Sequence, residues 1–312
     1  MTENGRSDLA RLEDDELLRS LELLSRDGGA ESATRAAILL LGRQEVIREH
    51  VPWHEVKLQR YGRDELTPIF NEDSRRPLLA ILQRAAEVIE VVNTVESFQS
   101  GFYRVDIPTF PQRAYREAVA NALIHRDYRQ AGNVALRVYQ DRLEIGSPGG
   151  WFGGIHEGNI LVTESKRRNE RLAEVLQRLG LAERSALGVR RMFEAQLLAG
   201  KAPPELRSTA TSVTVILHDG SFDRAFAAFV RRCEEEAIFL TVFDLLMFTH
   251  LRRHREIRLE DAARLCQQDE NAARRILDRL VVHGLLERCD EDGDRRWRLS
   301  ARSAGVLRAP AP

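Results

Sequence analysis

The amino-acid sequence predicts an α+β protein built from two parts that meet near residues 219–221. Three observations lead to this prediction. Helical and strand-like hydrophobic patterns alternate up to that point. A mostly helical segment with one expected hairpin follows it. The length of 312 residues also suits about two domains.

The composition is that of a folded chain with balanced charge. Hydrophobic residues make up 43% and charged residues 30%, which excludes an intrinsically disordered protein. The formal net charge of −1 at pH 7 argues against a histone-like protein that binds nucleic acid indiscriminately. Local basic surfaces remain possible, because residues 1–100 are acidic while residues 101–200 and 251–312 are mildly basic.

Several protein classes lack support because their motifs are missing. The sequence has no run of 18 or more apolar residues and no signal-peptide core, so we expect a cytoplasmic protein that does not enter a membrane. Its three cysteines form no CxxC pair, which argues against a zinc ribbon or a disulfide framework. The G-x-x-x-x-G-K-[ST] motif of P-loop ATPases is absent.

Hydrophobic spacing predicts the elements of the first part. Residues 1–75 should form helical and extended segments that pack on the core, with a helix at 9–24 and a strand at 51–58. Within residues 76–219 the expected elements are helices at 77–95, 112–126, 169–179 and 188–198, and strands at 102–107, 134–139, 142–145, 206–209 and 212–217.

The helix expected at 112–126 carries a polar stripe. Glu117, Asn121 and His125 recur every four residues and so share one side of the helix. The Glu117 carboxylate can orient and deprotonate a water molecule, and the Asn121 amide oxygen can coordinate Mg²⁺ beside phosphate oxygens. For this pair alone a solvated helix face is the commoner explanation. His125 can equally contact phosphate or make a structural hydrogen bond.

Four segments in a fixed order carry a resemblance to a known family. They are residues 116–128 (REAVANALIHRDY), 141–150 (DRLEIGSPGG), 168–169 (RN) and 179–192 (LGLAERSALGVRRM). In this order they resemble the GHKL-type (Bergerat-like) ATP-binding domain of Schlafen/AlbA-associated bacterial transcriptional regulators, often labelled RecG-related or putative helicases. The resemblance covers roughly residues 76–219. Family members commonly carry an AlbA-type domain before this region, and we expect this chain to lack it.

The resemblance implies an α/β sandwich with helices on one face of a mixed sheet, and ATP with Mg²⁺ as ligands. It implies that Glu117 is the general base and that Asn121 holds Mg²⁺. Ser147 stands where the superfamily has an aspartate for the adenine amino group. In the second glycine segment only Gly188 remains between Ser185 and Val189. The other expected nucleotide-binding residues are His125, Ser147, Gly149, Gly150, Arg168 and Gly188.

Residues 253–300 have the pattern of a winged helix-turn-helix domain. A helix at 259–265, a turn, a helix at 271–283 with a glycine stop and a hairpin at 285–299 follow one another. The second helix would enter the major groove. The expected DNA-binding residues are Arg274, Arg275, Arg279, Arg295 and Arg296. Winged helices also serve as protein-interaction modules, and that alternative stays open.

The remaining segments are expected to connect or to fray. Residues 220–252 should form connecting or dimer helices, and residues 301–312 a tail. Taken together, we expect an ATP-binding, DNA-binding transcriptional regulator, a homodimer whose geometry depends on the bound nucleotide. Two alternatives remain: a GHKL-type ATPase that remodels DNA or protein partners, and a dimeric interaction scaffold that binds no nucleotide.

Overall fold

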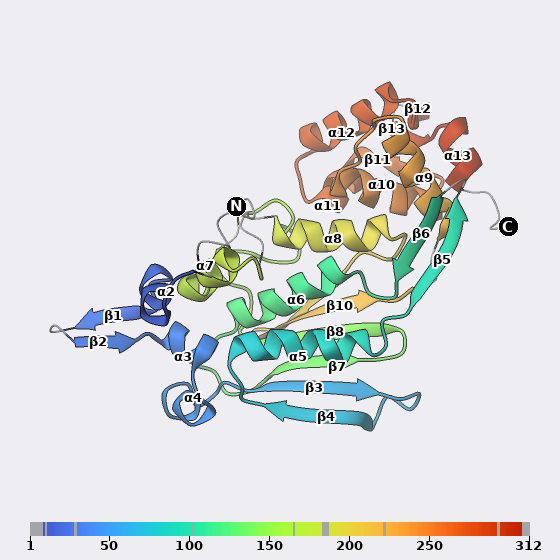
Figure 1. The fold of residues 1–312 in the computed structure, drawn as a ribbon. Coiled ribbons are helices and arrows are strands. Elements are labelled where there is room, and N and C mark those ends of the chain that lie inside the picture. The colour runs from blue at the N-terminus through green and yellow to red at the C-terminus, as the bar shows by residue number, and fades with distance from the viewer. Residues whose placement is uncertain are drawn as a thin grey trace.

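A six-stranded mixed sheet forms the centre of the first part of the chain (Figure 1). The computed structural model describes residues 9, 11–27, 30–100, 103–164, 166–182, 187–220, 223–291 and 294–307. The strand order is β4-β3-β7-β8-β10-β9. The strands are β3 (Val56–Tyr61), β4 (Pro68–Ser74), β7 (Val134–Val138), β8 (Arg142–Pro148), β9 (Glu205–Ser208) and β10 (Ser212–His218).

Neighbouring strands of this sheet are antiparallel except for β3 and β7, which are parallel. A parallel pair needs a long crossover, which here contains α5 (Leu78–Glu90) and α6 (Gln112–His125). Both helices lie on the same face of the sheet (Figure 1). Alternate residues of strand β8, Leu143, Ile145 and Ser147, are buried on the side of the sheet that faces these helices. This apolar side explains why the helices cover one face.

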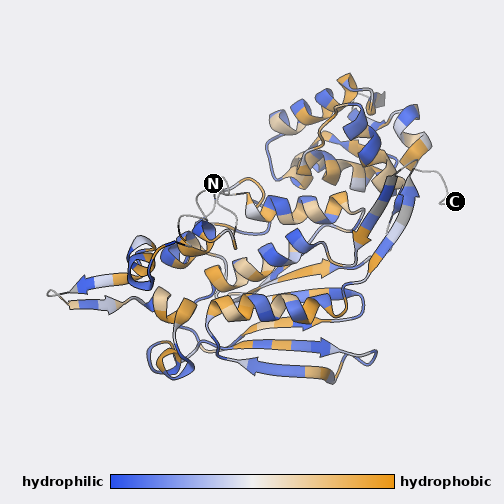
Figure 2. Cartoon of the chain, in the orientation of Figure 1, coloured by the Kyte–Doolittle hydropathy of each residue, from blue (hydrophilic) through white to orange (hydrophobic). Residues whose placement is uncertain are grey.

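The helices of the first part are amphipathic. Five buried residues of α5 recur at three- and four-residue spacing, and Pro77 precedes its first turn. Hydrophobic and hydrophilic residues alternate along α5 and α6 in Figure 2, as expected for helices with one buried face. Helix α8 (Gly188–Leu198) packs against α6, and α7 (Glu170–Arg178) precedes it.

The central sheet takes two of its strands from residues before 76, where the ATP-binding domain was expected to begin. Strands β3 and β4 come from residues 56–74 and supply one edge of the sheet. The sequence pattern does not reveal β4, because an edge strand with Asn71, Glu72 and Asp73 lacks a clear hydrophobic alternation. Before the sheet lie α2 (Asp14–Ser20), β1 (Leu24–Asp27), β2 (Ala30–Ala33), α3 (Arg35–Leu41) and α4 (Gln44–His50).

A separate hairpin, β5 (Val95–Ser100) and β6 (Tyr103–Pro108), follows α5. The last part of the chain contains a three-stranded sheet of order β11-β13-β12 with helices beside it. Its elements are α9 (Arg224–Glu235), α10 (Val242–Arg253), β11 (Glu256–Arg258), α11 (Leu259–Cys266), α12 (Glu270–Val282), β12 (Leu286–Glu291), β13 (Asp294–Leu299) and α13 (Ala301–Leu307).

Helix α13 replaces most of the expected tail. Residues 308–312 lie outside the described residues, whereas residues 301–307 are helical. The Ser300 hydroxyl accepts a hydrogen bond from the Ser303 amide, and Leu307 is buried. The small residues of this segment give no clear helical pattern in the sequence. The helix is stabilised by packing against α9 and β13. In the described part of the chain, no helix is both long and apolar enough to cross a membrane.

Candidate functional site

One cavity lies between α6, the turn after β8 and the first turn of α8. All eight residues expected at a nucleotide site line it, although they come from four separate segments of the chain. They are Glu117, Asn121, His125, Ser147, Gly149, Gly150, Arg168 and Gly188. The expected second glycine segment is described only in part, because residues 183–186 lie outside the described residues.

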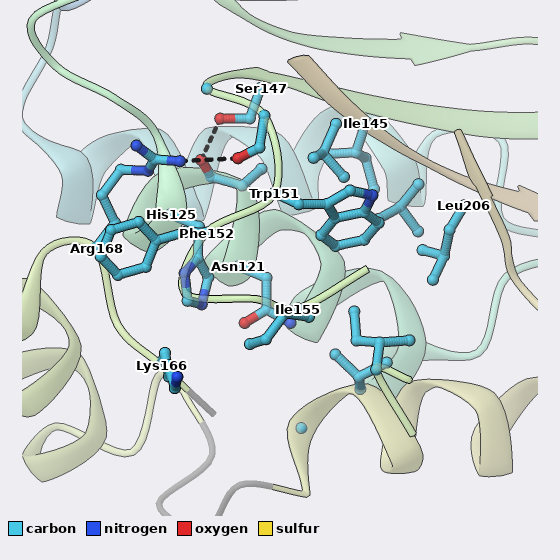
Figure 3. A pocket seen from close by; sticks show the side chains of 18 of the residues that line it. Asn121, His125, Ile145, Ser147, Trp151, Phe152, Ile155, Lys166, Arg168 and Leu206 are labelled. Atoms are coloured by element: carbon cyan, nitrogen blue, oxygen red, sulfur yellow. Dashed lines mark hydrogen bonds between the residues drawn. The ribbon is translucent and has the colours of Figure 1, made fainter. Parts of the chain in front are cut away.

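The cavity has an apolar side and a polar side. Figure 3 shows Trp151, Ile145 and Leu206 together on one side, and Arg168 and Lys166 on the other. Val213 and Val215 of β10 complete the apolar wall. A ligand that fills this cavity would therefore combine a flat apolar group with an anionic group.

Glu117 and Asn121 form a hydrogen-bonded pair on α6. The Asn121 amide nitrogen donates to Glu117 Oε1 over 3.1 Å, which leaves the Asn121 amide oxygen as an acceptor toward the cavity. Burial raises the pKa of Glu117, and the Asn121 hydrogen bond with the nearby charges of Arg191 and Arg113 opposes that rise. The pair thus offers a poorly solvated carboxylate beside a hard oxygen ligand.

Gly188 opens α8 directly against this carboxylate. A Cβ atom on Gly188 would lie 1.8 Å from Glu117 Oε1. Gly188 does not have a positive φ, so close approach and not backbone conformation favours glycine here. The arrangement also places Glu117 at the positive end of an 11-residue helix, which favours negative charge.

Gly188→Ala should therefore destabilise the fold by up to about 1 kcal/mol, because a methyl group would displace the half-buried Glu117 carboxylate, which is the end of a flexible side chain. Chemical denaturation measures this change in the free energy of unfolding. Gly305→Ala is the matched control, since a Cβ on this α13 residue meets nothing within 4 Å. It should stabilise by about 0.5–1 kcal/mol, as alanine usually does in a helix. Changes of the same sign in both variants would contradict the close approach.

The turn after β8 requires glycine twice, for different reasons. Gly149 has φ +106°, a region that favours glycine. At Gly150 a Cβ would lie 2.6 Å from the Ala210 carbonyl oxygen. The Gly149 amide donates to the Thr211 carbonyl over 2.7 Å, which fixes the turn against the start of β10.

Ser147 lies at the base of the cavity and is buried. Its hydroxyl donates to the Ala122 carbonyl over 2.7 Å. A hydroxyl has one donor and two acceptor lone pairs, so what remains for a ligand is acceptor capacity. Ser147 can thus accept from an amino group, the role that an aspartate would also serve.

Arg168 is held against the cavity wall by several contacts. Its guanidinium donates to the Gly150 carbonyl over 2.8 Å, lies 3.5 Å from Asp127 Oδ2 and stacks over the Phe152 ring at 4.9 Å. Asp127 is itself bound by Arg129, which lowers the pKa of Asp127 to about 2. A positive charge is therefore positioned in advance at the polar side of the cavity.

His125 is the neutral member of the polar side. Burial, and then the charges of Arg168 and Arg167, lower the pKa of His125 to about 4. At neutral pH the imidazole can exchange hydrogen bonds with a ligand but contributes no positive charge.

The sequence did not single out several residues of this cavity. Trp151 and Phe152 directly follow the glycine turn, and Lys166 comes from the loop before α7. The stem of Lys166 passes over Gly153, where a Cβ would lie 2.4 Å from Lys166 Cδ. Their position next to Gly150 and Arg168 was the available signal for them.

Comparison with known proteins relates part of this cavity to a recognised kind of domain. The family model described as putative ATP-dependent DNA helicase recG C-terminal matches residues 132–217. This range contains Ser147, Gly149, Gly150, Arg168 and Gly188. Glu117, Asn121 and His125 lie before it. The chain contains an ATPase-like domain. A model described as a domain of unknown function (DUF8451) matches residues 1–57.

The fold of the ATPase-like domain and its neighbours also occurs in a solved structure. The crystal structure of the DIP2311 protein from Corynebacterium diphtheriae is similar, with a TM-score of 0.78 and 23% sequence identity. The similarity covers 99% of this chain and 62% of that chain, so the two share a fold over the shorter length. No curated protein matches the chain.

The five arginines expected to contact DNA lie outside the ATPase-like domain and have different surroundings. Arg275 and Arg295 are exposed, and Arg274 is half-buried. Arg279 donates to both carboxylate oxygens of the buried Asp244, over 2.5 and 2.6 Å. Arg296 is paired with Glu256. Two of the five guanidinium groups are thus bound within the chain.

Proposed function

We propose that the ATPase-like domain binds ATP with Mg²⁺ and that residues 253–300 form a winged helix that binds DNA. The chain would then act as a nucleotide-responsive transcriptional regulator, with two copies presenting two DNA-binding units. The observation that carries the nucleotide half is the convergence of eight residues from separate segments on one two-sided cavity. ATP has the same two sides, an apolar base and an anionic triphosphate.

The apolar side suits adenine. Ile145, Val213 and Val215 present a flat wall from two paired strands of the sheet. Ser147 at its base retains an acceptor for an exocyclic amino group, because its own proton is donated to the Ala122 carbonyl. An amino-bearing purine therefore matches both the shape and the polarity of this side.

The polar side suits Mg²⁺ and phosphates. The Asn121 amide oxygen is a hard oxygen donor of the kind that Mg²⁺ accepts together with water and phosphate oxygens, and the Glu117 carboxylate lies beside it. When bound, the ion would neutralise part of the phosphate charge. Arg168, Lys166 and the first turn of α8 would supply positive charge and amide donors for the phosphates.

Thermal unfolding with and without ATP tests the nucleotide half. At about 100 times its dissociation constant, ATP should stabilise the protein by about 2.7 kcal/mol and raise the unfolding midpoint by several degrees. Asn121→Ala should lose the part of this shift that disappears when EDTA replaces Mg²⁺. If the Mg²⁺-dependent part of the ATP-induced shift in the unfolding midpoint is unchanged in Asn121→Ala, Asn121 does not hold the metal. If ATP causes no shift in the wild-type chain, the chain does not bind the nucleotide.

The arrangement of the C-terminal part supports the DNA half. Helices α11 and α12 are joined by a short turn and followed by the β12–β13 hairpin, which β11 extends to three strands. Trp297 of β13 is buried, so it stabilises the hairpin and cannot stack on bases. Arg275 on α12 and Arg295 on β13 are exposed and free to approach phosphates or base edges.

A double substitution of the two exposed arginines tests this proposal. Arg275→Ala with Arg295→Ala should weaken binding to duplex DNA and lower the salt slope of log K by about one for each arginine that had bound a phosphate. Fluorescence anisotropy at several salt concentrations measures both. Arg63→Ala, at an exposed position in the turn between β3 and β4, is the matched control. Equal salt slopes for the double variant and the control would contradict DNA contact through these residues.

A further inference from the structure

The loop at residues 155–163 forms one wall of the nucleotide cavity. Ile155, Ile160 and Thr163 of this loop line the cavity directly. Leu161 lies between them and is buried. Whatever holds the backbone of this loop therefore also sets the shape of the cavity.

A glutamine from the C-terminal part holds that backbone at two points. Gln267 directly follows α11 as its C-cap, and its side-chain amide oxygen accepts a hydrogen bond from the Leu161 backbone amide over 2.7 Å. Its amide nitrogen donates to the Glu157 carbonyl over 2.8 Å. Gln267 has φ 55°, an uncommon conformation for this residue type, and it lies in the turn that leads to α12.

The same loop residue is also bound by the ATPase-like domain. Arg190, in the first turn of α8, donates to the Leu161 carbonyl, and its guanidinium lies over the Phe243 ring of α10 at 5.6 Å. The Leu161 amide and carbonyl groups are thus bound from α11 and α8 respectively. Gly188 and Val189, next to Arg190, line the same cavity.

We propose that Gln267 is a positioning residue for the nucleotide site and that it couples occupancy of the cavity to the α11–α12 unit. This inference rests on the proposed function. A ligand in contact with Ile155, Ile160 and Thr163 favours one placement of the loop, and the Gln267 amide favours the α11–α12 placement that matches it. Thermodynamic linkage makes the effect reciprocal, so DNA on α12 would change nucleotide affinity by the same factor.

A substitution by asparagine isolates the reach of the side chain. Gln267→Asn keeps the amide group and suits the left-handed backbone, since asparagine adopts it more readily than most residues. It is one carbon shorter and so cannot make both loop hydrogen bonds. Gln268→Asn is the matched control, because the Gln268 side chain makes no hydrogen bond within the described part of the chain. Only its backbone N–H is bonded there, to the Ala263 carbonyl, and the substitution leaves that bond in place.

Hydrogen–deuterium exchange of the full chain, with and without Mg²⁺-ATP, tests the coupling. In the wild type and in Gln268→Asn, ATP should slow exchange in residues 155–163 and in α11 and α12. In Gln267→Asn it should slow exchange in the loop alone. ATP affinity should also fall about tenfold in Gln267→Asn, the change that a free-energy difference of 1.4 kcal/mol produces.

Each other outcome overturns a definite part of the inference. If ATP slows exchange of α11 and α12 in Gln267→Asn as much as in the wild type, Gln267 does not couple the two sites. Slower exchange of the loop alone in the wild type would reject the coupling while leaving the nucleotide site. No change anywhere in the wild type would reject the nucleotide site, and the coupling with it.

Discussion

Glu117→Gln is expected to lower the rate of ATP hydrolysis by about 10²- to 10⁴-fold, the usual contribution of a general base, while nearly preserving ATP binding. Glutamine has the same shape and still accepts the hydrogen bond that Asn121 donates to Glu117 Oε1. It cannot take a proton from water. Steady-state phosphate release gives kcat and KM separately, and kcat should carry the loss.

The pH dependence of hydrolysis identifies the same group. Glu117 must be deprotonated to act as a base, and burial raises its pKa above the ordinary value. The rate should therefore rise with pH through a pKa higher than that of an exposed glutamate, and this acid limb should vanish in Glu117→Gln.

Glu194→Gln is the matched control for this substitution. Glu194 lies on α8 and does not line the cavity, so its loss should leave hydrolysis unchanged. Equal rates in Glu117→Gln and the wild type would remove Glu117 from the chemistry. An absence of phosphate release in the wild type, with ATP binding retained, would favour a binding-only regulator over the ATPase alternative.

The largest effect on stability is expected for Arg126→Ala, which should lower the free energy of unfolding by about 3–5 kcal/mol. Arg126 directly follows α6 as its C-cap and is fully buried without a carboxylate partner among the described residues. Its guanidinium donates to the carbonyls of Asp127 over 2.8 Å and Gly132 over 2.6 Å, and to the Trp53 carbonyl. Alanine would leave these buried acceptors without donors.

Urea-induced unfolding, followed by circular dichroism, measures this change. Arg48→Ala is the matched control, because Arg48 is exposed on α4 and its removal should change the free energy of unfolding by at most about 0.5 kcal/mol. Arg126→Lys should lose nearly as much stability as Arg126→Ala, since one ammonium group cannot reach the three carbonyls that the planar guanidinium group binds. A loss below about 1 kcal/mol in Arg126→Ala would contradict a structural role for the buried guanidinium.

The parts of the fold that follow from local pattern were predictable. The helix at 112–126 appears as α6, and those at 169–179 and 188–198 as α7 and α8, because helical periodicity is written into neighbouring residues. The missed elements include β4, β11 and α13, which are short or polar. Their order comes from strands and helices distant in sequence, which a local pattern cannot show.

The candidate site divides in the same way. Glu117, Asn121 and His125 share a stripe because of the helical period, and glycine motifs marked the two turns beside them. The reason for Gly188 was hidden, because the atom that excludes a side chain belongs to Glu117, far away in sequence. The same holds for Arg279, whose partner Asp244 lies 35 residues away and is buried on another helix.

The sequence by itself determined the α+β class, the polar stripe of α6 and the glycine turns, because each depends on the spacing of nearby residues. Only the tertiary structure decided that these segments share one cavity, that Arg279 is bound within the chain, and that Gln267 holds a loop 106 residues before it. Such contacts depend on how separate elements pack, and packing brings together groups whose separation along the chain carries no periodic signal.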